Sequence, residues 1–465
     1  MLNKNTIDTN FDSMRFSRGN AGNAETADDF CKIITGSLAF LLGRKGLEME
    51  KHAYGSWKTQ LMLAGLGIVI GALVGGLDTI FGKVLLWVSD IRTAHIFYLV
   101  PALPLVGVCI VWAYKKYGGR SGEGMGLILS VSHREDKEVP RRLIPFVMIS
   151  TWLTHLFGGS AGREGVAVQL GATVSHQVGK RFSIEDGTHI FLLTGMAAGF
   201  AGLFRTPLAA IFFAMEVPVV GQLALRAILP MCTAAFTAAS VSAFLGLEKF
   251  QVPLELQMTV TPVFVGKLIV IGLIFGCVGS LFAFLLGKSK KKLAEILPNP
   301  LLRVFLGGII LSILLLFFHQ GRYTGLGTNL ISASFYGEDI YAYDWILKIL
   351  LTVFTLSLGF QGGEVTPLFS IGASLGVILV GFMGLPVMLA AALGYAAVFG
   401  SATNTFFAPI FIGAEVFGYE YLPLFAVACL AAHIFCHFPS IYGKQKHGSY
   451  RKSLLQLAKR KEKSI

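Results

Sequence analysis

The chain has 465 residues, of which 54% are hydrophobic and only 14% are charged. Soluble domains carry about 25% charged residues, so this composition excludes an ordinary soluble enzyme and a disordered or fibrous protein. The net charge of 39 − 27 = +12 is concentrated at the end of the chain, where residues 443–465 carry eight Lys or Arg and one Glu. A basic segment directly after an apolar one is typical of a cytoplasmic membrane flank. We therefore predict a polytopic membrane protein that does not bind nucleic acid.

The first segment, residues 1–48, has mixed polarity and no apolar stretch long enough to span a bilayer, which takes about 20 residues. We expect it to be a cytoplasmic tail that the fold does not need, or sequence upstream of the true start. Apolar segments follow one another from Trp57 onward. They predict helices at 57–89, 95–116, 143–157, 165–178, 189–203, 207–219, 223–245, 262–287, 300–319, 344–359, 366–382, 385–399, 405–417 and 421–437.

Many of these segments are shorter than a full membrane span and are interrupted by Gly or Pro. In transporters, matching breaks in two halves of the chain indicate the binding site. Here Phe157–Gly165 and Phe360–Pro367 occupy corresponding places, and each half continues to a helix with a lone glutamate, Glu216 or Glu415. We therefore predict an all-α membrane protein of two inverted halves, with broken helices that meet at a central anion site. The predicted parts are a tail (1–48), two transmembrane halves (49–250 and 251–442) and a basic cytoplasmic tail (443–465).

Orientation follows from the Lys and Arg residues beside the apolar segments, because cytoplasmic flanks are enriched in them. They predict that both termini are cytoplasmic in a multi-pass protein of the inner (plasma) membrane. The flanking residues are Lys51, Lys58, Lys115, Lys116, Arg120, Lys288, Lys290, Lys291, Lys292 and the cluster between Lys444 and Lys463.

The strongest functional signal is Gly162-Arg163-Glu164-Gly165, at the start of a predicted helix. A helix N-terminus offers free N–H groups and a partial positive charge, and glycine lets an anion approach the backbone. An ionised Glu164 would fill such a site, whereas a protonated Glu164 could leave it and admit the anion. One side chain would then be both gate and proton carrier. The alternative is a capping glutamate, although carboxylates at membrane depth usually have a function.

Two further glycine breaks follow the same logic. In the second half, Gly362-Gly-Glu364-Val-Thr-Pro367 places a second carboxylate beside a helix start, where it either caps the helix or takes part in proton transfer. Gly122-Glu-Gly-Met-Gly126 follows a basic flank, and since no strand precedes it, a dinucleotide loop is excluded. We expect a helix to start there and to point toward the anion path. Tyr442 either faces the pore or anchors the chain at the membrane interface.

No cofactor, metal or enzymatic site is predicted. The six cysteines are scattered without paired spacing, and His433, Cys436 and His437 lack a further ligand nearby. The sequence also contains no nucleophile elbow or P-loop. We therefore predict a secondary transporter rather than an enzyme.

These motifs, in this order, resemble the CLC family of anion channels and transporters over roughly residues 50–465. The Gly122–Gly126 segment stands at the family's central-serine loop, Gly162–Gly165 at its gating-glutamate loop and Gly362–Pro367 at its third anion-site loop. Tyr442 stands at the central tyrosine. The resemblance implies a homodimer with one ion pathway in each subunit.

The departures from the chloride-handling members are informative. Those members read Gly-Ser-Gly-Ile-Pro in the first loop and Gly-x-Phe-x-Pro in the third, whereas this chain has Met125 and the sequence Glu364-Val365-Thr366. Val166 replaces the usual proline of the second loop, and Val217 stands where many chloride/proton exchangers carry an internal glutamate. These features are similar to the fluoride-specific bacterial branch, CLC-F.

The CLC-F resemblance implies fluoride/proton antiport that expels fluoride and gives fluoride resistance. The alternatives are a chloride/proton antiporter or a passive anion channel of the same fold. Expected partners are fluoride, protons, membrane lipid and a second subunit. Gating and proton transfer are assigned to Glu164 and Glu364. Anion binding is assigned to Gly122, Gly124, Met125, Gly162, Arg163, Gly165, Val166, Val365, Thr366 and Tyr442.

Overall fold

The computed structural model describes residues 57–255, 259–437 and 439–448. The predicted tail of residues 1–48 and most of the basic C-terminal tail lie outside the described residues. The elements of the first half are α2 (Trp57–Ala94), α3 (Ile96–Leu99), η1 (Val100–Ala102), α4 (Leu103–Ala113), η2 (Tyr114–Gly118), η3 (Gly119–Glu123), α5 (Met125–Ser132), α6 (Leu143–Leu156), α7 (Glu164–Gly179), α8 (Gly187–Phe204), α9 (Pro207–Glu216), β1 (Val219–Val220), η4 (Leu225–Ala227) and α10 (Ile228–Phe244). Those of the second half are α11 (Pro262–Ile296), α12 (Pro300–Phe317), η5 (His319–Gly321), α13 (Thr328–Tyr336), α14 (Asp344–Leu358), α15 (Val365–Met383), α16 (Val387–Thr403), α17 (Phe407–Phe417), η6 (Tyr419–Tyr421), α18 (Leu422–His433), η7 (Ile434–His437) and β2 (Lys446–His447).

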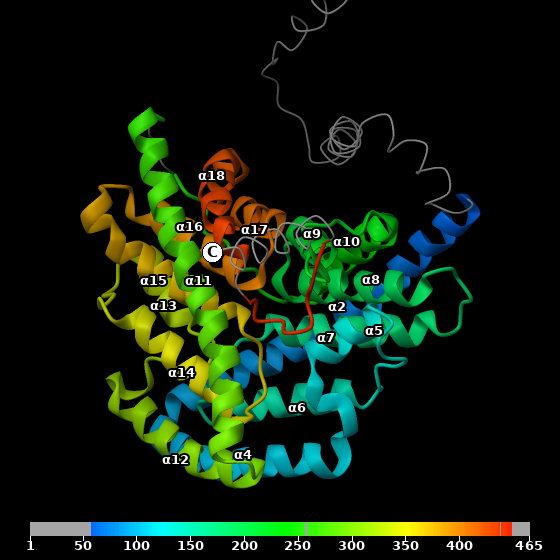
Figure 1. Ribbon diagram of the computed structural model, residues 1–465, viewed down its shortest axis with the longest axis horizontal. Helices are drawn as coiled ribbons and strands as arrows, with labels where there is room; N and C mark the ends of the chain where they lie inside the picture. The colour runs from blue at the N-terminus through cyan, green and yellow to red at the C-terminus, as the bar shows by residue number, and fades with distance from the viewer. Residues whose placement is uncertain (1–56, 256–258, 438, 449–465) are drawn as a thin grey trace, which may run out of the picture. The chain divides into compact units, whose positions relative to one another are not determined.

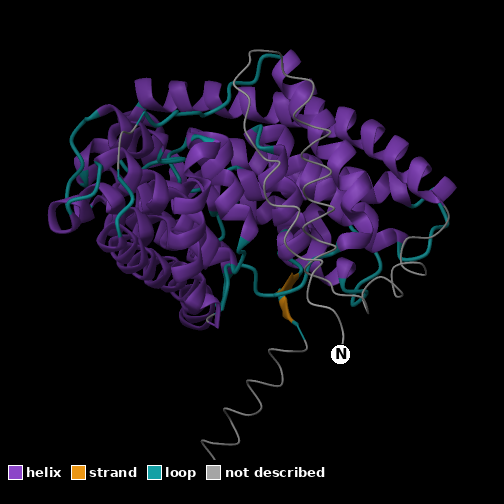
Figure 2. Cartoon of the chain, turned by 90° about the horizontal axis from the view of Figure 1, so that it is seen from above, coloured by secondary structure: helices purple, strands orange, loops and turns teal. Residues whose placement is uncertain are grey.

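The all-α prediction is confirmed, since the described chain is almost entirely helical apart from one short parallel pair, β1 with β2 (Figure 2). The helix predicted at 95–116 is confirmed as one helical run, Ile96–Glu123, in which α3, η1 and α4 follow one another near Pro101 and Pro104. The predicted helix at 262–287 continues to Ile296 through a run of lysines, which are good helix formers. Helix α13, which has nine residues between two glycines with positive φ angles, was not predicted from the sequence.

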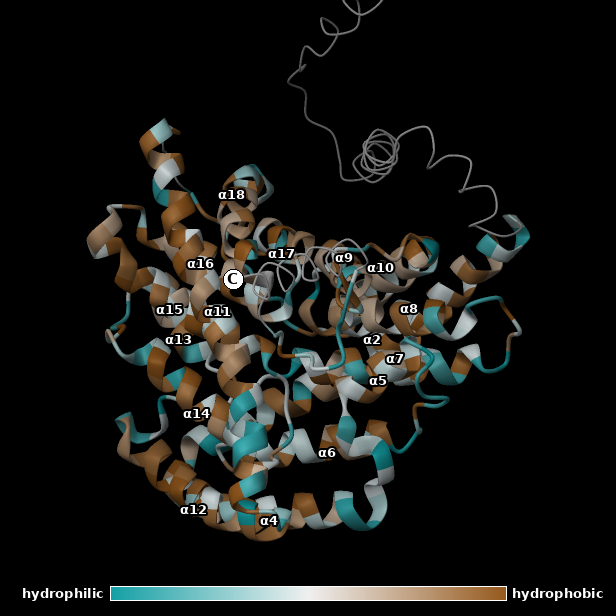
Figure 3. Cartoon of the chain, viewed as in Figure 1, coloured by the Kyte–Doolittle hydropathy of each residue, from teal (hydrophilic) through white to brown (hydrophobic). Residues whose placement is uncertain are grey.

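Seven helices in the described residues are long and apolar enough to cross a membrane. They are α2, the segment Ile96–Glu123, α8, the segment Leu225–Phe244, α11, α12 and α15. In Figure 3, hydrophobic residues cover α12 and α14, whereas hydrophilic residues gather at the C-terminal end of α11. The chain is therefore a multi-pass membrane protein.

Matching glycine contacts show that the two halves repeat one arrangement. In the first half, Gly171 of α7 packs directly against Gly195 of α8, and in the second half Gly372 of α15 packs in the same way against Gly394 of α16. A second contact is repeated as well. Glycines of α2 contact α10 in the first half, and glycines of α11 contact α18 in the second half. Small residues allow membrane helices to approach closely, so the repeat predicted from the breaks is built on glycine contacts.

A reciprocal contact joins the halves at α9 and α17, which lie side by side (Figure 1). Glu216 ends α9, and its carboxylate accepts hydrogen bonds of 2.9–3.2 Å from the N–H groups of Phe406, Phe407 and Ala408 at the start of α17. Near the end of α17, the Glu415 carboxylate accepts bonds of 2.9 and 3.1 Å from Ala209 and Leu208 at the start of α9. Each glutamate thus caps the helix of the other half. The lone glutamates of the sequence repeat are structural partners.

The glycine contact between α7 and α8 leads to a testable expectation. A Cβ at Gly171 would overlap the Gly195 carbonyl oxygen, which belongs to the backbone and cannot rotate away. We expect Gly171→Ala to lower the free energy of unfolding by about 1–3 kcal/mol, the usual cost of overpacking. Thermal unfolding of the detergent-purified protein measures this loss. Gly76→Ala on α2 is the control, because its Cβ would have nothing within 4 Å. Equal stability of both variants would contradict the assigned packing.

Candidate anion and proton site

The two glycine breaks that carry glutamates meet in space. Gly162 and Gly363 form an antiparallel bridge, in which each N–H donates to the carbonyl of the other at 2.5 and 2.7 Å. Helices α7 and α15 begin directly after these residues. A Cβ at Gly162 would lie 3.0 Å from the Gly363 oxygen and 2.9 Å from Pro367, so only glycine fits this approach. The bridge places the N-termini of two helices from different halves against each other.

The Glu164 side chain crosses from its own helix to the start of the other one. Its carboxylate is fully buried, and Oε2 accepts hydrogen bonds from the Thr366 N–H at 3.1 Å and from the Thr366 hydroxyl. Oε2 also accepts a hydrogen bond of 3.3 Å from the N–H of Arg163, the residue before α7. The carboxylate therefore lies at the start of its own helix, as predicted, and also reaches the start of α15, which was not predicted. The site is the first turn of α15, where N–H groups and the helix dipole favour a negative charge.

Unsatisfied donors surround this carboxylate. Arg163 lies with Nε 3.6 Å from Glu164 Oε1, and its Nε and Nη1 atoms make no hydrogen bond within the described residues. The Tyr442 hydroxyl is also buried and has no partner in that part of the chain. It lies close enough to Glu164 and Glu364 for an electrostatic interaction with both. Buried donors without partners are rare in proteins, and both of these lie near Glu164, where a bound anion would supply an acceptor.

Glu364 occupies a mirror position at the other helix start. A Cβ on Gly165, in the first turn of α7, would be 3.6 Å from Glu364 Oε2. The other carboxylate oxygen, Oε1, lies 3.9 Å from Nζ of Lys290 on α11. Glu164 therefore reaches the first turn of α15, and Glu364 lies beside the first turn of α7. Val365 and Thr366 are buried in the first turn of α15, and Val166 is buried in that of α7.

The third break, Gly122–Gly126, forms the expected helix start. Gly124 has a φ of +53° and precedes Met125, the first residue of α5, which is buried and packs in the main core cluster. Glu123 lies on the surface, where Arg120 donates to it at 2.7 and 2.9 Å and to Asp136 at 2.6 and 2.8 Å. The hydrogen bonds from Arg120 hold the pKa of Asp136 below its usual value. Glu123 is thus engaged in a surface ion pair.

Lys348, which is fully buried in α14, was not predicted from the sequence as a site residue. Its Nζ donates to the carbonyls of Gly325 at 2.8 Å and Tyr323 at 3.1 Å, and to the Ser160 hydroxyl at 2.9 Å. The lysine thereby ties the 323–325 loop to the segment that leads into Glu164. A lone lysine inside an apolar segment is a sequence signal that would have found it.

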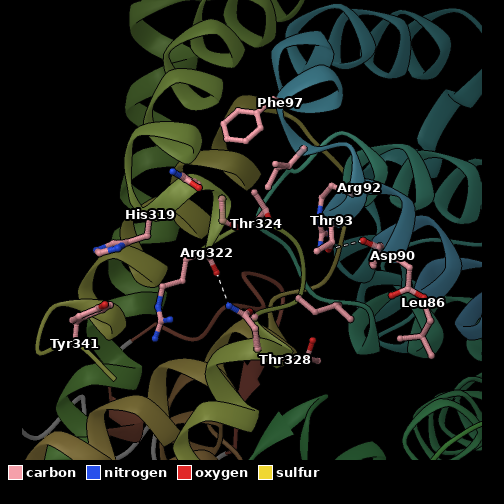
Figure 4. Close-up of a pocket in the computed structure, with 17 residues that line it drawn as sticks. Leu86, Asp90, Arg92, Thr93, Phe97, His319, Arg322, Thr324, Thr328 and Tyr341 are labelled. Atoms are coloured by element: carbon pink, nitrogen blue, oxygen red, sulfur yellow. Dashed lines mark hydrogen bonds between the residues drawn. The ribbon is translucent and has the colours of Figure 1, made fainter. Parts of the chain in front are cut away.

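The same loop contributes to the lining of a polar cavity of about 680 Å³ (Figure 4). Its lining includes Arg92 from the end of α2 and Arg322 from the η5–α13 connection. Arg322 is paired with Asp344, whereas Arg92 donates to the His155 carbonyl at 3.2 Å. Thr324 and Leu326 line the cavity, and Gly325 between them bonds to Gly159 and Ala161 of the segment that leads into Glu164. The cavity is therefore a neighbour of the carboxylate site and separate from it.

The profile of the voltage gated chloride channel family matches residues 106–437, which is most of the chain. The chain belongs to this family, the CLC proteins. Its arrangement of paired broken helices around a buried glutamate agrees with the predicted CLC fold of two inverted halves.

Two groups of CLC relatives show what the chain is similar to. The chloride/fluoride channel protein of Pseudomonas syringae pv. tomato is 34% identical over 395 residues, which are 83% of this chain and 86% of the relative. The H(+)/Cl(-) exchange transporter ClcA of Citrobacter koseri is 27% identical over 354 residues, or 69% and 72% of the two chains. The crystal structure of a CLC-type fluoride/proton antiporter is 53% identical with a TM-score of 0.83, and covers 84% of this chain and 100% of that one. A slow cyanobacterial Cl-/H+ antiporter, with 20% identity, a TM-score of 0.70 and coverage of 83% and 96%, shares the fold.

Proposed function

We propose that this CLC protein is a fluoride/proton antiporter that exports fluoride from the cytoplasm in exchange for protons. The observation that carries the proposal is the Glu164 carboxylate, buried at the start of α15 with hydrogen bonds from Thr366. A titratable anion there competes with a transported anion for the same donors. The similarity to a CLC-type fluoride/proton antiporter at 53% identity supports fluoride as the substrate.

The geometry supports a mechanism in which the Glu164 carboxylate and the transported anion occupy the start of α15 in turn. While Glu164 is ionised, its carboxylate satisfies the first turn of α15 and closes the path. Protonation removes its negative charge, so the helix start no longer holds it, and an anion takes its place among the donors of Thr366, Arg163 and Tyr442. Return of the carboxylate requires loss of the proton and departure of the anion. Proton movement and anion movement are thereby coupled through one side chain.

Fluoride suits the residues of this site. It is small and strongly hydrated, so removal of its water requires close and strong donors, such as backbone N–H groups at helix starts beside glycine. Hydrogen fluoride crosses membranes as a neutral weak acid and dissociates at cytoplasmic pH, so fluoride accumulates in the cell. Coupling of export to inward proton flow overcomes this accumulation. Met125, Val365 and Thr366 are the residues to which we assign the preference over chloride.

The proposal also covers the orientation of the transporter in the membrane and its number of subunits. The lysine-rich flanks support an orientation with both termini in the cytoplasm and a location in the inner membrane. The polar cavity at the far end of α2, with Arg92 in its lining, would then face the outside, where fluoride leaves. We assign the protein two subunits, as in the family it belongs to, with one pathway in each. Cross-linking of the protein in native membranes tests this assembly.

The function is tested with purified protein in proteoliposomes loaded with fluoride. A fluoride electrode measures efflux, and a pH electrode outside measures proton uptake. We expect fluoride efflux to draw protons inward against their gradient, and chloride efflux to be at least about tenfold slower, a difference of about 1.4 kcal/mol in barrier. Equal rates for chloride would favour a chloride/proton antiporter. Fluoride efflux without proton uptake would favour a passive channel.

A further inference from the structure

The inference concerns the route by which a proton leaves Glu164 toward the cytoplasm, as the proposed antiport requires. At the end of α9, the described residues provide no free titratable side chain that could accept this proton. Val217 is apolar and buried there. The neighbouring Glu216 carboxylate is occupied by the backbone N–H groups of Phe406, Phe407 and Ala408. The proton exit therefore has to be built from a different part of the fold.

Side-chain exposure falls in steps from Lys290 through Glu364 to the buried Glu164. The Lys290 side chain is 47% exposed and that of Glu364 is 15% exposed, whereas that of Glu164 is only 1% exposed. Lys290 Nζ lies 3.9 Å from Glu364 Oε1, and Glu364 lies beside the first turn of α7 that follows Glu164. Of the two carboxylates at the helix starts, Glu364 is the one in contact with a solvent-exposed ionic group.

The position of Lys290 on α11 defines the side of the membrane. It belongs to the run Lys288–Lys292, which marks a cytoplasmic flank. The other lysines of the run have different surroundings. Lys288 lies over the ring of Phe284 at 5.4 Å, and Lys292 lines an apolar cavity between α11, α12 and α14. Within the described residues, Lys290 is the lysine of this run that pairs with Glu364.

The charges that face Glu364 have opposite effects. Lys290 on α11 favours the ionised carboxylate, because an opposite charge at this distance stabilises it. Glu164 on α7 favours the protonated form when it is itself ionised. Tyr442, close to both carboxylates, is neutral and has a free hydroxyl in the described part of the chain. Burial has the largest effect on Glu364 and favours the protonated form, so its charge depends on a balance between burial and Lys290.

We propose that Lys290 is a positioning residue for proton release, which favours the ionised form of Glu364 and so lets the proton received from Glu164 pass to cytoplasmic water. The inference rests on the proposed antiport function. In this step the proton leaves the carboxyl group of Glu164, protonates the Glu364 carboxylate, and is then transferred to water beside Lys290. Both carboxylates end ionised, and Glu164 returns to the start of α15.

The sign of the expected effect follows from the charge of Lys290. Without it, Glu364 retains its proton to higher pH, so release becomes the slow step at a pH where the wild-type protein still turns over. We expect Lys290→Gln to shift the acidic limb of the rate–pH profile upward by about 0.5–1 pH unit, as for one charge at 4 Å in a half-exposed setting. Raising the pH restores the wild-type rate.

The experiment measures coupled fluoride efflux and proton uptake at equal pH on both sides of the vesicle membrane, across a series of pH values. Lys290→Arg keeps the charge and is expected to restore the wild-type profile. Lys291→Gln is the matched control, since it removes the same charge from an exposed neighbour on α11. In a Glu364→Gln background, Lys290→Gln is expected to add no further shift, because the group it acts on no longer titrates.

Two results would overturn this role. A raised KM for fluoride with an unchanged pH profile would mean that Lys290 attracts the anion and leaves proton release alone. A Lys290→Gln profile identical to that of the wild-type protein, while the wild type still couples fluoride to protons, would reject the inference and leave the proposed function standing. Absence of coupling in the wild type would reject both.

Discussion

Glu164→Gln is expected to abolish proton uptake during fluoride efflux, with a fall of at least about tenfold to the background of the assay. The amide resembles the protonated carboxyl group in shape and charge but cannot release or accept the proton. It also cannot offer the negative charge that Thr366 and the start of α15 hold in the wild-type protein. Simultaneous fluoride and pH electrode recordings from proteoliposomes measure the ratio of the two fluxes.

Two further variants test the role of the Glu164 side chain. Glu164→Ala removes the side chain that closes the path, so fluoride efflux should persist without proton uptake, whereas the glutamine variant retains a side chain in the path. Glu295→Gln, an exposed glutamate near the end of α11, should leave both fluxes at the wild-type level. Proton uptake at the wild-type ratio in the glutamine variant would show that another group carries the proton.

Glu216→Ala is expected to be among the most destabilising single changes in the membrane domain. It leaves the backbone N–H groups of Phe406, Phe407 and Ala408 without their shared acceptor in a buried setting. Each buried unsatisfied donor costs about 1–3 kcal/mol, so we expect a loss of roughly 2–5 kcal/mol after local relaxation. Glu415→Ala acts on the start of α9 in the same way, with two N–H groups exposed instead of three. We therefore expect a smaller loss from it.

Thermal unfolding in detergent, followed by the monodisperse fraction on size-exclusion chromatography, measures both losses. Glu216→Gln retains one acceptor oxygen and should recover a large part of the stability, while Glu295→Ala on the exposed face of α11 should have no effect. If Glu216→Ala unfolds at the wild-type temperature but loses transport, the carboxylate has a functional role in place of the capping role.

Local patterns of the sequence were enough to predict the class of protein and the main helices. Long apolar segments with few charges specify membrane helices because lipid offers no partner for polar groups. Glycine and proline mark helix ends for reasons of backbone geometry alone, which is why the starts of α7 and α15 and the glutamates beside them were predicted correctly. The same local rules missed α13, whose nine residues are too short to stand out from the surrounding glycine-rich loop.

Local sequence patterns could not predict the contacts that assemble the site. The bond between Glu164 and Thr366 joins residues 202 positions apart, and that between Glu216 and Ala408 joins residues 192 positions apart. Each depends on how the inverted halves pack. The sequence by itself determined that the Glu164 carboxylate lies at a helix start, and only the tertiary structure decided that the start of a second helix, α15, shares it. The pairing of Glu364 with Lys290 likewise depends on the path of the long helix α11 past the start of α15. Helix ends are set by neighbours along the chain, whereas the partners of a side chain at membrane depth are set by the helices packed around it.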